Sequence, residues 1–113
     1  MVLLKDIIEP LKCTVLCGED RLGTSEVTGG YACDLLSWVI SRVQTGEVWM
    51  TILSSVNVVA VAVLAECSCI LLTEEVTMNE SVLERAREKG ITVLSTPLPT
   101  YRACAILADL VDK

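Results

Sequence analysis

The longest predominantly apolar segment of the chain runs from Val56 to Ala65 and contains a single polar residue, Asn57. Its length, its repeated alanines and the potential capping residues Ser55 and Asn57 favour a helix over a strand. A helix that is apolar on every side has no face to expose to water and must be buried all round. In so short a chain, this requirement predicts that a second molecule covers part of the helix.

The other hydrophobic positions alternate between helical and strand spacing. Helices are expected over residues 2–11, 35–43, 79–89 and 100–111, with Asp34 as the N-cap of the second. Strands are expected over residues 13–17, 26–31, 47–53, 68–72 and 91–94. Alternating short strands and helices predict an α/β fold: a mostly parallel central sheet of about five short strands with helices on both faces.

The length of the chain indicates its number of domains, and its net charge limits its possible partners. A chain of 113 residues is expected to form a single domain, residues 1–113. The net charge of −6 argues against nucleic acid, because binding to phosphates requires clustered lysine and arginine. The apolar segment is far shorter than the roughly 20 residues that span a bilayer, and polar residues appear too early for a signal peptide. We therefore expect a cytoplasmic protein with no membrane partner.

The chain contains six cysteines and no histidine. With no sign of secretion, the cysteines are expected to be reduced thiols packed as small hydrophobic residues. The spacings of Cys13 and Cys17 and of Cys67 and Cys69 fit one face of a strand, and the sequence has no Cys-x-x-Cys pair. We therefore expect no metal and no cofactor, and a redox or metal protein is the least favoured alternative.

Hydroxyl groups and glycines gather where the predicted strands end. In open parallel sheets, ligands bind beyond the carboxyl ends of the strands. Glycine lets a ligand approach the main chain, and a helix N-terminus offers free amides to an anion. A small phosphate-bearing ligand fits this pattern, although the same residue types also occupy turns and caps for structural reasons. The candidate ligand-binding residues are Thr28, Gly29, Gly30, Thr51, Ser55, Asn57, Ser95 and Thr96.

Catalytic residues do not stand out. The sequence has no histidine, no recognisable nucleophile motif and no cluster at metal-ligand spacing. Glu74 and Glu75 are adjacent, but neighbours on an extended chain point in opposite directions. We therefore expect a protein that is not an enzyme. A homodimer would cover the apolar helix, and its candidate interface residues are Val58, Val59, Ala62 and Val63.

Several segments resemble the DRTGG domain family, and the resemblance covers nearly the whole chain. The family's Asp-Arg-Thr-Gly-Gly motif corresponds to Glu26, Val27, Thr28, Gly29 and Gly30. Val27 therefore stands where the motif has the arginine that could bind a phosphate through two parallel hydrogen bonds. The other matching segments are residues 34–39, Thr51, residues 57–64, residues 90–96 and the closing helix.

The resemblance implies a fold similar to the N-terminal domain of HPr kinase/phosphorylase. DRTGG domains occur beside CBS domains in regulatory pyrophosphatases and have no assigned catalytic residue. The leading hypothesis is thus a non-catalytic regulatory or interaction module, a homodimer that binds a small ligand or a partner enzyme. The alternative is a nucleotide- or phosphate-sensing domain with its site at the carboxyl ends of the strands.

Overall fold

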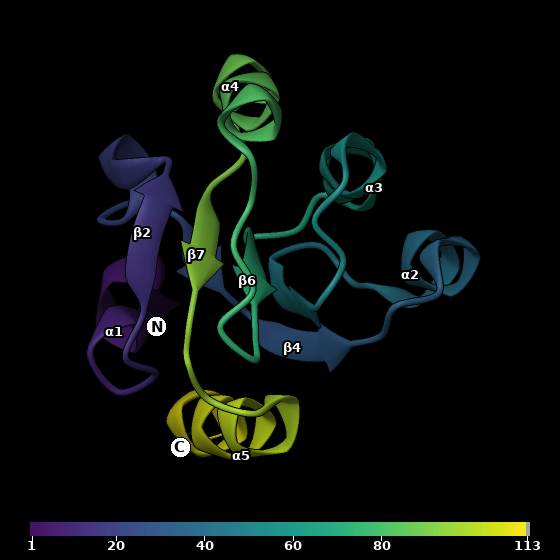
Figure 1. Cartoon of the computed structure of the whole chain (residues 1–113). Helices are drawn as coiled ribbons and strands as arrows, with labels where there is room; N and C mark the ends of the chain where they lie inside the picture. Colours follow the sequence, from purple (N-terminus) through teal and green to yellow (C-terminus); the bar gives the residue numbers. More distant parts are fainter. Residues whose placement is uncertain (113) are drawn as a thin grey trace.

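The computed structural model describes residues 1–112 and is built around a five-stranded sheet of order β2-β7-β6-β5-β4 (Figure 1). Strands β4, β5, β6 and β7 run parallel to one another, and β2 pairs antiparallel with β7. The predicted α/β fold with a mostly parallel sheet is confirmed. The strands are β2 (Thr14–Cys17), β4 (Gly29–Ala32), β5 (Glu47–Thr51), β6 (Cys69–Leu72) and β7 (Val93–Ser95).

Helices cover both faces of this sheet. Helices α2, α3 and α4 pack on one face, and α1 and α5 pack on the other (Figure 1). The helices expected over 56–65, 79–89 and 100–111 are confirmed, because hydrophobic spacing and capping signals agree in these segments. The helices are α1 (Leu4–Ile8), α2 (Leu36–Arg42), α3 (Val56–Ala65), α4 (Glu80–Lys89) and α5 (Thr100–Val111).

Successive strand residues supply two separate cores. Trp49 and Ile70 point toward α2, α3 and α4, whereas Val48 and Leu71 point toward α1 and α5. This alternation follows from the two-residue period of a strand. All four residues of β6 are buried, as expected for a parallel strand that is covered on both faces. The sheet therefore holds the two helical layers in fixed positions.

The N-terminal segment differs from the predicted helix over residues 2–11. Val2–Leu3 forms strand β1, which pairs antiparallel with β3 (Glu26–Val27), and α1 covers only the next five residues. The helix ends before Pro10, because proline has no amide hydrogen to continue the backbone ladder. The prediction was therefore too long at both ends.

The segment over residues 26–31 forms two strands rather than one. Val27 belongs to β3 in the two-stranded sheet, and the chain enters β4 only at Gly29. Between them, the Thr28 amide donates a hydrogen bond to the Gly46 carbonyl at 3.0 Å. The Thr28-Gly29-Gly30 motif thus lies at the amino end of β4.

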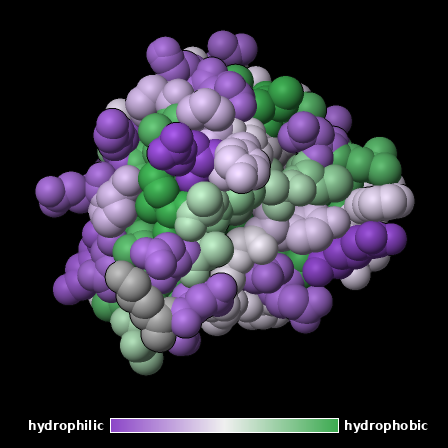
Figure 2. Space-filling model, turned by 90° about the horizontal axis from the view of Figure 1, so that it is seen from below, coloured by the Kyte–Doolittle hydropathy of each residue, from purple (hydrophilic) through white to green (hydrophobic). Residues whose placement is uncertain are grey.

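The surface on the α5 side carries hydrophobic residues in separate areas between hydrophilic ones (Figure 2). On α5 itself, Tyr101 is the most exposed large hydrophobic side chain, whereas Ala103 and Leu107 face the sheet. Within residues 1–112, no helix combines the length and hydrophobicity that crossing a membrane requires.

Candidate functional site

The predicted ligand-binding residues lie at two opposite ends of the sheet. Thr28, Gly29 and Gly30 lie at the amino end of β4, whereas Thr51 and Ser95 lie at the carboxyl ends of β5 and β7. Four residue steps along β5, at about 3.3 Å each, separate the two ends by roughly 13 Å. The expectation that Thr28 to Gly30 lie at the carboxyl end of a strand of the central sheet was wrong, because Val27 pairs in the other sheet and β4 begins at Gly29.

A hollow of about 440 Å³ lies beside the Thr28-Gly29-Gly30 motif, between β4, β5 and α5. Its nine described lining residues include the carboxylates of Glu47 and Asp112 and no lysine or arginine. One Glu47 oxygen already accepts the Gln44 amide at 2.7 Å. The negative charges of these two carboxylates would repel a phosphate, and no basic side chain lines the hollow to balance them. The hollow therefore does not have the electrostatics of a phosphate site.

Packing explains the motif's second glycine. A Cβ atom on Gly30 would lie 2.6 Å from Cδ2 of Leu107 and 3.0 Å from Cε of Met50. Glycine at this position therefore lets α5 pack closely on the edge of the sheet. The Thr28 hydroxyl also has a local role, because it donates to the Thr45 carbonyl at 3.0 Å.

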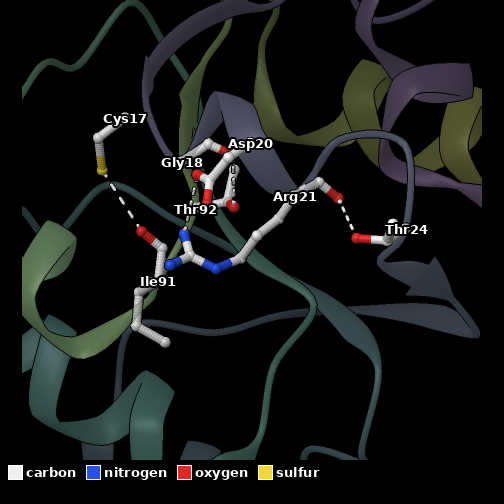
Figure 3. A network of polar contacts seen from close by, with 7 residues as sticks. All are labelled: Cys17, Gly18, Asp20, Arg21, Thr24, Ile91 and Thr92. Atoms are coloured by element: carbon white, nitrogen blue, oxygen red, sulfur yellow. Dashed lines mark hydrogen bonds and ion pairs between the residues drawn. The ribbon is translucent and has the colours of Figure 1, made fainter.

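Arg21, the nearest basic residue before the motif in sequence, lies far from it in space. It belongs to the short 3₁₀ turn Glu19–Arg21 beyond β2, whereas the motif lies on β4 at the other edge of the sheet. Four strand spacings of about 4.8 Å separate these edges by roughly 19 Å. Arg21 instead lies 3.5 Å from Asp20 and extends past Gly18 and Thr92 (Figure 3).

At the carboxyl end of the sheet, the two buried threonines among the candidate residues already have hydrogen-bond partners. The Thr51 hydroxyl donates to Oδ1 of Asp34 at 2.6 Å and accepts the Leu53 amide at 3.1 Å. The Thr96 hydroxyl donates to the Leu11 carbonyl at 2.6 Å and accepts the Leu98 amide. These hydroxyls fix the loops that follow β5 and β7.

Ser55, Asn57 and Ser95 are more accessible than these threonines. Ser55 and Asn57 are exposed at the start of α3, and Ser95 is partly buried at the end of β7. In the part of the chain that the structure describes, the Ser55 side chain makes no capping hydrogen bond. These three residues stay candidates for ligand contact.

Asp34 does not cap α2, contrary to the prediction. Helix α2 begins after Leu35, and the Asp34 carboxylate instead accepts the Thr51 hydroxyl and the Ile52 amide, the latter at 3.1 Å. Asp34 thereby ties the end of β4 to the end of β5. The sequence could not show this, because the partners lie 17 and 18 residues away.

The adjacent carboxylates Glu74 and Glu75 form a turn and not an acid–base pair. Both have positive φ angles, 59° and 64°. The Glu74 carboxylate accepts the amide of Thr100 at 2.9 Å, at the start of α5. A carboxylate at a helix N-terminus stabilises the helix, so Glu74 has a structural role.

The predicted interface residues on α3 are mostly part of the protein's own core. Val58, Val59 and Ala62 are buried by the sheet and by the neighbouring helices, and only Val63 is exposed. The exposed side of α3 instead carries Val56, Ala60, Val63 and Leu64. Helix α3 is therefore apolar all round, but within the single chain only one of its sides is covered.

Helix α2 exposes a second group of apolar side chains. Leu35, just before α2, and Trp38 and Ile40 within it have exposed fractions of 53%, 47% and 47%. The Arg42 guanidinium lies over the Trp38 ring at 3.9 Å from its centroid. We call these four residues the α2 surface. Hydrophobic spacing predicted that Leu35 and either Ile40 or Val43 face the core. Leu35 and Ile40 are exposed, whereas Val43 is buried.

Burial disfavours the thiolate form of Cys13, Cys67 and Cys69. Burial raises the pKa of Cys13 from its ordinary value of 9.0 to about 12 and that of Cys67 to about 11. Burial also raises the pKa of Cys69 well above its ordinary value. Metal binding and nucleophilic attack require the thiolate form. Among residues 1–112, no three histidine, cysteine or acidic side chains come close enough to hold a metal ion.

A comparison with the sequence models of protein families shows which family the domain belongs to. The sequence model of the DRTGG domain matches residues 6–110. The chain belongs to the DRTGG domain family. This DRTGG domain keeps the Thr-Gly-Gly part of the motif, and its Val27 side chain is buried in the core between the sheet and α1. No curated protein matches the chain in sequence.

The DRTGG domain is similar in structure to a crystal structure of the CBS and DRTGG domains of the regulatory region of Clostridium perfringens pyrophosphatase, complexed with its activator diadenosine tetraphosphate. The TM-score is 0.73 and the sequence identity 17%, over 93% of this chain and 45% of that chain. This likeness shows the fold, and the present chain spans less than half of that regulatory region.

Proposed function

We propose that this DRTGG domain is a non-catalytic regulatory module that acts in the cytoplasm as a homodimer and binds a small ligand or a partner protein. The observation that carries the proposal is the α2 surface beside β4, the edge strand of the sheet. The free cysteines fit a reducing compartment. Burial raises the pKa of Cys13 and Cys67, which argues against thiolate chemistry at these two residues.

The composition of the α2 surface supports its use as an interface. Tryptophan and arginine dominate the residues that contribute most to protein–protein binding, and here Trp38 and Arg42 are stacked together. Burying about 300 Å² of apolar surface per subunit, at ~25 cal/mol per Å², contributes roughly 7 kcal/mol for each subunit. This contribution exceeds the lower end of the association cost, about 4 kcal/mol.

The geometry of β4 favours a second copy of this chain as the partner. Strand β4 pairs with β5 on one side and has no strand on its other side within the described sheet. An open edge strand can pair with the edge of another chain. In a twofold dimer, the same edge of each copy meets its equivalent, so β4 and the α2 surface would be covered together.

The homodimer is tested by replacing Trp38 with glutamate and measuring mass by sedimentation equilibrium at micromolar concentration. We expect a dimer for the unmodified protein and a monomer for Trp38→Glu, because a buried, unpaired carboxylate opposes association. Tyr101→Glu is the matched control, since Tyr101 is 86% exposed but lies on α5 across the sheet. A monomeric unmodified protein, or a dimeric Trp38→Glu variant, would contradict the proposal.

Nucleotide sensing is the second candidate function. The likeness to a regulatory region complexed with diadenosine tetraphosphate favours it, and Ser55, Asn57 and Ser95 remain accessible. The carboxylates beside Thr28 to Gly30 argue against a phosphate at that end of the sheet. A nucleotide at 100 times its dissociation constant should stabilise the fold by about 2.7 kcal/mol. Thermal unfolding unchanged by millimolar nucleotides would remove this candidate.

A further inference from the structure

A groove of about 500 Å³ runs between α3 and α4, two helices that lie side by side on the same face of the sheet (Figure 1). Its apolar part comes from α3, and its basic part comes from α4. Of the candidate residues predicted on α3, Asn57, Val59 and Val63 line this groove, whereas Val58 and Ala62 do not. The lining residues are Val56, Asn57, Val59, Ala60, Val63, Leu64, Arg85 and Lys89.

The apolar side of the groove has the dimensions of a helix-binding site. Val56, Ala60, Val63 and Leu64 recur at the spacing of one helical face and form a stripe along α3. The small side chain of Ala60 at the middle of the stripe lets another backbone approach closely. A ten-residue helix is about 15 Å long, so a helix of about 12 residues could lie along the whole stripe.

The basic side of the groove favours an occupant with acidic groups. Arg85 lies 3.4 Å from Glu88, but both side chains are more than half exposed, and such a pair contributes little. Lys89 makes no ion pair within residues 1–112. Two cations beside an apolar stripe complement a ligand that combines apolar and acidic groups.

In an antiparallel contact, the α3 helix of a second copy does not provide that charge. Helices α3 and α4 run in the same direction, because each returns from the carboxyl end of one parallel strand to the amino end of the next. A twofold contact along α3, with its axis perpendicular to the helix, would lay the two α3 helices antiparallel. It would bring the first turn of α3, which has no acidic residue, next to Lys89 at the end of α4. A different, acidic partner fits better.

We propose that the groove between α3 and α4 binds an acidic amphipathic helix of a partner protein. Apolar residues of that helix would pack on the α3 stripe, and its carboxylates would pair with Arg85 and Lys89. This is the helix-in-groove mode of recognition. The proposal rests on the regulatory function proposed above and names its class of partner.

The test uses a synthetic peptide of about 12 residues, with leucine at helical spacing and glutamate elsewhere. Amide signals of the ¹⁵N-labelled full-length domain are followed by NMR during the titration. We expect shifts confined to α3 and α4, and no binding by the same peptide with lysine in place of glutamate. Arg85→Glu combined with Lys89→Glu should weaken binding by at least about tenfold. Arg102→Glu on α5 is the matched control and should leave binding unchanged.

Three results would overturn this proposal: no shifts with the glutamate peptide, equal binding of both peptides, or unchanged binding by the double variant. Shifts at α3 and α4 that grow with protein concentration without peptide would show that a second copy occupies the groove, which also overturns it. Dispersed spectra confirm that each variant is folded. A monomeric domain that binds the glutamate peptide would contradict the homodimer but support the groove, so the two failures are distinguishable.

Discussion

Replacing Trp49 with alanine is expected to lower the free energy of unfolding by about 4 kcal/mol. Trp49 is the largest fully buried side chain and lies in the core between the sheet and α2, α3 and α4. Its indole Nε1 donates to the Cys33 carbonyl at 2.9 Å, just beyond the end of β4. Removing it empties a large core volume and frees the segment that leads into α2. Urea unfolding followed by circular dichroism measures the loss.

The Trp49→Phe variant separates the two contributions of this side chain. Phenylalanine keeps most of the apolar volume and loses the hydrogen bond to Cys33, so we expect a loss of about 1–2 kcal/mol. A loss of less than about 1 kcal/mol for Trp49→Ala would show that the Trp49 site is not a packed core position.

Replacing Gly18 with alanine is expected to lower the free energy of unfolding by about 3 kcal/mol, from backbone strain and overpacking. Gly18 has a φ angle of 87° at the end of β2. A Cβ atom there would lie 2.6 Å from the Cα atom of Thr92, a backbone contact that a side-chain rotation cannot relieve. The substitution would also disturb the bond from the Thr92 hydroxyl to the Gly18 carbonyl (Figure 3).

Gly23 provides the matched control for this substitution. It lies in the same loop, and a Cβ atom on it would have no neighbour within 4 Å. Gly23→Ala should change stability by less than about 1 kcal/mol, because it only restricts the unfolded chain. Equal melting temperatures for the two variants would contradict the assigned role of Gly18.

The helices were the most predictable part of this fold. For α3, α4 and α5, hydrophobic spacing and capping signals are local, so the sequence located them within a residue or two. The start of the chain was less predictable, because Val2–Leu3 forms a strand only through pairing with residues 26–27. That partner strand is distant in sequence, so nothing in residues 2–3 themselves indicates the pairing.

The candidate site was harder to predict than the fold, because it depends on strand direction. The sequence shows Thr28, Gly29 and Gly30 next to a β-prone segment, but it does not show that β4 begins inside this motif. Likewise, the apolar sequence of α3 does not reveal which side the sheet covers. The sequence indicates that Arg85 faces solvent, and only the position of Arg85 and Lys89 beside α3 makes them a candidate binding element.

The proposed homodimer covers the α2 surface. Hydrogen–deuterium exchange of the unmodified protein at low and high concentration tests it most directly. We predict that the amides of α2 and β4 exchange more slowly as concentration rises, while those of α5, across the sheet, exchange at a constant rate. Exchange in α2 and β4 that is independent of concentration across the micromolar range would contradict the claim.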